Sequence, residues 1–270
     1  IFKQSYKTFF ISIFVAVFEV ILSLIFINNI RQFEFKSDGR IYGIALANIV
    51  VGAALFFKIM FRGKLNVSKE HIKFCLPLCL PLMFHSLSHL ILAQSDRVML
   101  QHFSTESIVG VYSFIFTVTQ IINIIGTALN YTWTAFYIDD LKVKKYEEIK
   151  KKTTNYIYLF TSLTICLMFV FPEIIKCFSP PEFWSGINLV PIMALSSFFV
   201  FLYTLPSNFE CFYKKTIYIA IGTTCAAVLN IVLNIFLIPS WDMLGASVAN
   251  AISYFLLFIF HELIAKYVIK

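Results

Sequence analysis

The chain has 270 residues, of which 59% are hydrophobic and only 14% are charged. A soluble domain is usually about 45–50% apolar and about 25% charged, so this composition excludes an ordinary soluble protein. The apolar residues come in blocks of about twenty, the length that a helix needs to cross the hydrocarbon core of a bilayer. The sequence therefore predicts an all-α integral membrane protein. Its net charge of +7 indicates membrane topology and contact with anionic lipid, not binding to nucleic acid.

Eight apolar segments, joined by short connections, are predicted to be transmembrane helices. They cover residues 8–30, 41–61, 74–94, 108–130, 154–171, 188–206, 217–238 and 245–265. With the N-terminal end in the cytoplasm, 17 of the 22 basic residues fall on the cytoplasmic side, as the positive-inside rule requires. Both ends of the chain are therefore predicted to be cytoplasmic.

The first and third spans contain ionisable residues at membrane depth. Such a residue costs about 2.5–3.5 kcal/mol on insertion scales, so it marks a candidate site. Glu19 is interpreted either as a coupling group for a proton or cation, or as an acid at a helix contact. His85 and His89 are four residues apart, so they share one helix face. That face is either a wet inward surface or a set of satisfied core histidines, and Pro81 of the same helix predicts a bend.

Asp96 and Arg97 stand together where the third span is predicted to end at the outer surface. One interpretation is an interfacial anchor, in which the two side chains form an ion pair that ends the helix. The other is an outer gate or coupling pair. The residues alone leave both interpretations open.

Uncharged polar residues follow one face of two later spans. The amides Gln120, Asn123 and Asn130 fall within a narrow arc of the fourth span, and Asn230 and Asn234 repeat this pattern in the seventh. They are candidates for lining a hydrophilic cavity, and the alternative is hydrogen bonding between helices. The six cysteines lack the spacing and further ligands of a metal site, so we expect reduced structural thiols and no bound metal.

The loops offer little room for catalysis. The longest cytoplasmic connection, residues 139–153, has acidic residues four positions before lysines, at Glu147 and Glu148, which predicts a short surface helix. The longest outer connection, residues 172–188, is too short for an extracytoplasmic catalytic domain. The chain is therefore predicted not to be an enzyme.

Two stretches resemble a known family. In LPLMFHSLSHLILAQSDRVMLQHFSTESIVGVYSF, residues 80–114, a proline near the helix start is followed by Asp96-Arg97 and then by Gly-Val-Tyr at 110–112. In LNIVLNIFLIPSWDMLGASVANAIS, residues 229–253, asparagines precede an Ile-Pro turn and Gly-Ala-Ser at 245–247. Both patterns are similar to the O-antigen and polysaccharide flippases, the Wzx-like members of the multidrug/oligosaccharidyl-lipid/polysaccharide (MOP) exporter superfamily. The stretch at residues 38–50 is a weaker match.

The resemblance implies a twelve-helix, two-lobe MATE/MOP-like transporter, whose helices five to twelve this chain would contain. Residues 1–73 would be the last two helices of the N-terminal lobe with the cytoplasmic linker, and residues 74–270 the six-helix C-terminal lobe. Since the chain begins at Ile1 and not at methionine, we expect a fragment that lacks about four helices of such a protein.

The resemblance also implies a function. It is that of a flippase in the bacterial cytoplasmic (inner) membrane, which moves an undecaprenyl-pyrophosphate-linked oligosaccharide for O-antigen, lipopolysaccharide or capsule. An H⁺ or Na⁺ gradient would drive it, no other cofactor is expected, and its partners would be lipids and other polysaccharide-assembly membrane proteins. The alternatives are a multidrug or metabolite cation antiporter of the same superfamily, and a membrane polysaccharide polymerase or acyltransferase.

Overall fold

The computed structural model describes residues 5–29, 36–63 and 68–267. Within these ranges the chain is helical and contains no strand, and seven helices are long and apolar enough to cross a membrane. The predicted all-α membrane fold is confirmed. The chain divides into two units, Ile1–Ile72 and Lys73–Lys270, and each is described by itself. Four of the 22 basic residues counted in the predicted charge distribution, Lys3, Arg31, Lys64 and Lys270, lie outside the described residues.

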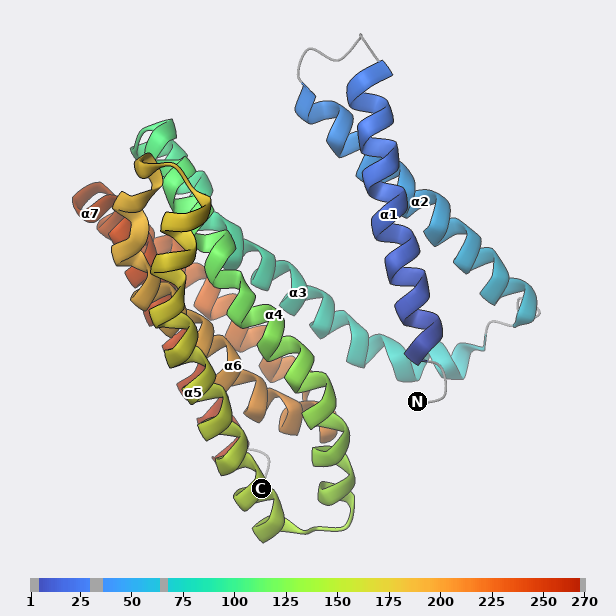
Figure 1. The fold of residues 1–270 in the computed structure, drawn as a ribbon. Coiled ribbons are helices and arrows are strands. Elements are labelled where there is room, and N and C mark those ends of the chain that lie inside the picture. Colours follow the sequence, from blue (N-terminus) through green and yellow to red (C-terminus); the bar gives the residue numbers. More distant parts are fainter. Residues whose placement is uncertain (1–4, 30–35, 64–67, 268–270) are drawn as a thin grey trace. The chain divides into compact units, whose positions relative to one another are not determined.

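The first unit is a hairpin of two helices, α1 (Ser5–Asn29) and α2 (Lys36–Arg62) (Figure 1). The helices approach each other closely at Gly43, where a Cβ atom would lie 2.6 Å from Cα and N of Ser23. Small residues at such a crossing let the two backbones pack tightly in a membrane, where there is little hydrophobic force between helices. Most of the remaining apolar surface is exposed. Only 6% of the residues in the most apolar 18-residue stretch of α1 are buried, as suits helices that face lipid.

Gly43→Ala is expected to destabilise this hairpin. The new methyl group would meet backbone atoms of Ser23 at 2.6 Å, and overpacking of this kind costs about 1–3 kcal/mol. Gly52→Ala is the matched control on the same helix, because no atom lies within 4 Å of its added Cβ. Thermal unfolding in detergent should show a lower Tm for Gly43→Ala alone. Equal Tm values for the two variants would show that the helices do not pack at Gly43.

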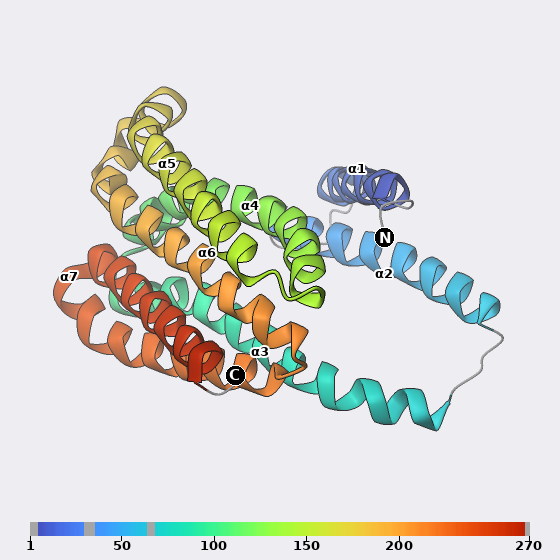
Figure 2. The ribbon, with the colours of Figure 1, turned by 90° about the horizontal axis from the view of Figure 1, so that it is seen from below.

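The second unit is a bundle of longer helices. Its elements are α3 (Lys69–Phe103), α4 (Glu106–Lys142), α5 (Tyr146–Phe178), the short 3₁₀ helix η2 (Pro181–Leu189), α6 (Val190–Phe212) and α7 (Thr216–Tyr267). In Figures 1 and 2, α4, α5 and α6 lie side by side. Their contact surface is aromatic, with the rings of Phe160 and Phe201 stacked at a centroid distance of 3.9 Å.

The last helix contains both of the last two predicted spans, 217–238 and 245–265. The helical run is broken at Asp242, whose φ of 45° and ψ of −128° are not helical. Figure 2 shows the two halves, orange and red, lying side by side. Contacts of Gly222 with Phe260 and His261 place the halves antiparallel. Each of the eight predicted spans therefore corresponds to a helical segment, and the last two form a helical hairpin within α7 that is joined by a single tight turn at Asp242.

Several helices extend beyond their predicted spans. The third span was predicted to end at residue 94, but α3 continues to Phe103, since residues 95–103 contain neither glycine nor proline to stop it. The predicted surface helix before the fifth span forms the first turns of α5, which starts at Tyr146. Hydrophobic length sets how much of a helix lies in lipid, whereas helix propensity and capping set where it ends.

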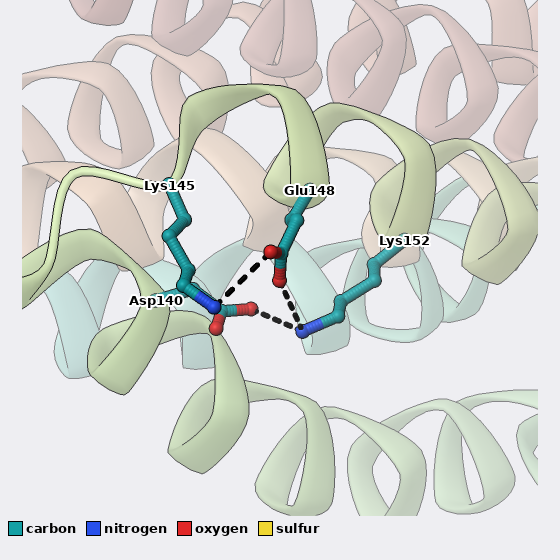
Figure 3. Close-up of polar contacts among 4 residues, drawn as sticks. All are labelled: Asp140, Lys145, Glu148 and Lys152. Atoms are coloured by element: carbon teal, nitrogen blue, oxygen red, sulfur yellow. Dashed lines mark hydrogen bonds and ion pairs between the residues drawn. The ribbon is translucent and has the colours of Figure 1, made fainter.

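The turn between α4 and α5 is held by ion pairs (Figure 3). Lys152 Nζ lies 2.6 Å from Asp140 Oδ2 and 3.8 Å from Glu148 Oε2, and Lys145 Nζ lies 3.1 Å from Glu148 Oε1. The expected pair of Glu148 with Lys152 is therefore present. Lys145, Glu148 and Lys152 are about half exposed, so the two pairs of Glu148 contribute little to stability. Asp140 is only 16% exposed, so its pair with Lys152 is the more protected contact that fixes the turn.

Candidate functional site

The third helix carries a buried stripe with one residue on each turn. Its members Ser88, Leu92, Asp96 and Leu100 are four residues apart, so they lie on one face. Asp96 is 1% exposed, and Leu92 and Leu100 are fully buried on either side of it. The interpretation that Asp96 ends its helix is wrong, because α3 continues for about two more turns to Phe103 and this face packs against the bundle.

Three side chains from two other helices donate hydrogen bonds to the Asp96 carboxyl group. The hydroxyl of Tyr112, on α4, donates to Oδ2 at 2.7 Å. From the first half of α7, Asn234 Nδ2 donates to Oδ1 at 2.9 Å. From the second half, Asn250 Nδ2 donates to Oδ2. The carboxyl group therefore joins three of the helices of the second unit.

A further asparagine completes a connected network. Asn230 Nδ2 donates to Asn250 Oδ1 at 3.2 Å, and Asn230 Oδ1 accepts from Asn234 Nδ2 at 3.0 Å and from Ser95 Oγ at 2.7 Å. Together Asp96, Tyr112, Asn230, Asn234 and Asn250 form what we call the Asp96 centre. Every member is at least nine-tenths buried, and such a network fixes the relative positions of its helices when its groups are satisfied.

The Asp96 centre contains no base. Among the described residues, no lysine, arginine or histidine forms an ion pair with Asp96. The ion pair considered between Asp96 and Arg97 does not form, because consecutive residues of a helix point in different directions. Arg97 instead places its guanidinium 4.5 Å from the centre of the Phe116 ring and donates weakly to Gln94 at 3.3 Å.

The polar lining of the centre retains one free acceptor. Asn234 Oδ1 is buried and has no hydrogen-bond partner among the described residues. An uncompensated carboxylate is costly in a dry interior, so a carboxyl group with three neutral donors and a free amide oxygen beside it suits a bound proton or a small monovalent cation. Within the described residues there is no cluster of three His, Cys, Asp or Glu side chains that could hold a metal ion.

The other predicted site residues fall into separate groups. His85 and His89 share a face of α3, with ring centroids 6.1 Å apart, and His85 Nδ1 lies 2.7 Å from Thr223 Oγ1 of α7. Glu19 belongs to the first unit, where it accepts a hydrogen bond of 2.7 Å from Asn48 across the hairpin. The carboxyl group of Glu19 therefore has a hydrogen-bond partner on the neighbouring helix α2.

The predicted cavity residues divide in two. Gln120 and Asn123 line a cavity of about 30 Å³ between α3, α4, α6 and α7, and Asn123 and Asn130 line another of about 130 Å³. Asn230 and Asn234 do not line these cavities, because both are fully buried in the Asp96 centre. Hydrogen bonding between helices therefore describes these two asparagines better than cavity lining.

Two members of the centre were not predicted as site residues. Tyr112 belongs to the Gly-Val-Tyr motif, yet a tyrosine near a helix start reads equally well as an interfacial anchor. Asn250 lies in the small-residue stretch after the last turn, sixteen residues beyond Asn234. A third buried asparagine in an apolar segment was the available signal, but its pairing depends on the antiparallel fold of α7.

The helices and the Asp96 centre together define a multi-pass membrane protein whose bundle has a polar, carboxyl-containing interior. Residues 81–236 match the model of the MatE family, which is more than half of the chain, so the chain belongs to this family of membrane transporters. The predicted membership of the MOP superfamily is confirmed.

Two further comparisons each match part of the chain. Residues 3–133 match the family model described as polysaccharide biosynthesis protein. Protein 1 of the Lsg locus of Haemophilus influenzae is 26% identical over 145 residues, which are 50% of this chain and 35% of that relative. The chain thus matches about one third of the relative's length. No solved structure matches the chain significantly.

Proposed function

We propose that this protein is part of a flippase that moves a polyprenyl-linked oligosaccharide across the bacterial cytoplasmic membrane. A sugar headgroup cannot enter hydrocarbon without losing its hydrogen bonds to water, while the lipid tail can stay in the bilayer. A transporter with a polar interior open toward lipid meets both needs. The match of residues 3–133 to the polysaccharide biosynthesis model, within a chain of the MatE family, is the observation that carries the proposal.

The Asp96 centre is proposed as the coupling site. Ionisable groups inside membrane bundles commonly mark ion and proton pathways, and Asp96 joins α3, α4 and both halves of α7 through its hydrogen bonds. Binding of H⁺ or Na⁺ would neutralise the carboxylate and allow these helices to pack. Loss of the ion would weaken the same packing, and this gives alternating access a driving force. Glu19, His85 and His89 are proposed to contribute to coupling or to the inner surface.

The experiment that tests the flippase is deletion of the intact gene in its host. We expect lipid-linked oligosaccharide to accumulate in the inner leaflet and finished surface polysaccharide to be lost, because the headgroup no longer reaches the outer leaflet. Both changes should be reversed by the gene on a plasmid. A normal polysaccharide coat without accumulation would contradict the proposal.

A second candidate is a cation or drug antiporter, which is favoured by the match of residues 81–236 to the MatE model. It predicts normal surface polysaccharide in the deletion strain, together with greater sensitivity to cationic drugs and slower efflux of a fluorescent cation. The deletion strain therefore separates the two transport functions in one experiment.

A further inference from the structure

The second unit contains a buried acid and base that lie apart from the Asp96 centre. Glu210 of α6 and His261 of the second half of α7 are both 0% exposed. His261 Nδ1 lies 2.8 Å from Glu210 Oε1. The other polar atoms, Glu210 Oε2 and His261 Nε2, are also buried and have no hydrogen-bond partner among the described residues. Buried polar atoms are seldom left unpaired, so this pair calls for an explanation.

The pair and the Asp96 centre lie toward different ends of the bundle. Glu210 is two residues from the end of α6, and His261 Nε2 lies against Gly222, near the start of α7. Asp96 lies instead beside Asn234, twelve residues further along α7 than Gly222. At 1.5 Å per residue this separation is roughly 18 Å along the helix axis. The two groups are therefore separate sites.

A chain of stacked rings leads from one site toward the other. The ring of His261 lies 5.9 Å from that of Tyr203, which lies 6.4 Å from that of Tyr254. Tyr254 follows Asn250 of the Asp96 centre by one helical turn and is 6.4 Å from the ring of His89. Tyr203 and Tyr254 are both more than nine-tenths buried. The pair thus belongs to the buried polar interior of the bundle, and not to its lipid-facing surface.

The surroundings supply no other charge that pairs with Glu210 or His261. Among the titratable groups of the packed elements, Tyr203 and Cys211 of α6 and His85 of α3 interact with the pair, while the neighbouring Glu262 of α7 is exposed. Within the described residues, the ion pairs of Glu210 and His261 are confined to each other. The charge of the pair therefore depends on its own protons.

The number of protons on the pair follows from its burial. With one proton shared between them, the pair has no net charge, either as carboxylate with imidazolium or as carboxylic acid with neutral imidazole. Removing that proton leaves a lone buried carboxylate, and adding a second leaves a lone buried imidazolium. Each lone charge is strongly disfavoured in a dry interior, so the singly protonated pair is favoured while the bundle is closed.

We propose that Glu210 and His261 together bind one proton and form a second proton site of the transporter, distinct from the Asp96 centre. The proton leaves for water when α6 and the second half of α7 separate, which leaves a carboxylate and a neutral imidazole that can then be solvated. It returns when the helices close. The use of this proton in transport rests on the proposed function, but the binding of the proton can be measured without any substrate.

The test is nuclear magnetic resonance of the intact protein with ¹⁵N-labelled histidine and ¹³C-labelled glutamate carboxyl groups, between pH 5 and pH 9. His261→Gln assigns the His261 signals, and the exposed His71 and His102 serve as reference signals. At pH 7.5 we expect one proton on the pair, seen as a charged His261 or as a protonated Glu210.

Two variants separate proton binding from packing. Glu210→Gln keeps the shape and an acceptor for His261 but removes the carboxylate, so the pair should lose its proton and His261 should be neutral at pH 7.5. Glu262→Gln, a change of the same kind at the exposed neighbouring position, should leave all His261 and Glu210 signals unchanged. An ionised Glu210 beside a neutral His261 in the wild type at pH 7.5 would overturn the proposal. Failure of the flipping assay would leave this result unaffected, so the two proposals can fail independently.

Discussion

Replacing Asp96 with alanine is expected to destabilise the second unit by about 3 kcal/mol or more. Tyr112, Asn234 and Asn250 each donate to this carboxyl group, and all of them are buried. Removal of a shared acceptor leaves buried donors unsatisfied at about 1–3 kcal/mol each. Asn234 keeps a second acceptor in Asn230, so Tyr112 and Asn250 account for most of the loss. The measurement is thermal or denaturant unfolding of the intact protein in detergent.

Asp139→Ala is the control for this prediction. Asp139 makes an exposed pair with Lys142, and its own side chain is 76% exposed. Such a pair contributes about 0–1 kcal/mol, so the control should unfold close to the wild type. If Asp96→Ala were as stable as Asp139→Ala, the hydrogen bonds to Asp96 would contribute nothing net, and the centre would not hold its helices together.

Gly245→Ala is expected to have a comparably large effect, through backbone contact in place of hydrogen bonding. A Cβ atom at this position would lie 2.3 Å from the carbonyl oxygen of Leu237 and 2.5 Å from its carbonyl carbon. These are backbone atoms that cannot rotate away, so the two halves of α7 must separate near the turn at Asp242. We expect a loss of about 2–3 kcal/mol or more, together with weaker contact of Asn250 with Asp96.

The matched control is Gly110→Ala, since no atom lies within 4 Å of the Cβ that this change adds. Neither glycine has a positive φ, so the two substitutions differ in the space available and not in backbone strain. Yield of folded protein and Tm in detergent are the readouts. Equal behaviour of the two variants would mean that α7 does not fold back tightly at this turn.

Hydrophobic length was sufficient to predict the membrane class and where each apolar helix lies along the chain, although it did not predict where each helix ends. Blocks of about twenty apolar residues are dictated by bilayer thickness, and this constraint is independent of how helices pack. It could not show that residues 217–238 and 245–265 meet in a single turn at Asp242, because the residues between them, Pro-Ser-Trp-Asp-Met-Leu, resemble an ordinary connection. The assignment of the two units to the lobes of a twelve-helix protein stays a prediction.

The sequence identified Asp96 as a candidate site residue, but it did not predict that this residue is buried in a hydrogen-bond network. Its neighbour Arg97 suggested a polar helix end, and hydropathy falls at this point whether a helix stops or continues into a packed bundle. The deciding facts are long-range, since the donors come from residues 16, 138 and 154 positions away. Burial of a carboxyl group can be recognised only once those partners are placed.

The contact between Glu210 and His261 could not be predicted from the sequence either. Glu210 is followed by Lys214 and Lys215, and His261 is followed by Glu262 and Lys266, so both residues look like the polar ends of spans. In the structure they face each other across α6 and α7 while their charged neighbours face outward. A single residue of register on a helix turns a side chain by about 100°, and this decides between surface and interior.

The most direct test of the central claim is the distribution of lipid-linked oligosaccharide between the two leaflets in a deletion strain that carries the intact gene with Asp96→Asn. This change keeps the size of the side chain and one acceptor oxygen while removing its ability to bind H⁺ or Na⁺ as a carboxylate. We predict that the protein is present in the membrane at normal level, that oligosaccharide accumulates in the inner leaflet, and that surface polysaccharide falls at least tenfold. Normal export by Asp96→Asn, with Asp139→Asn as the control, would contradict the assignment of the Asp96 centre as the coupling site.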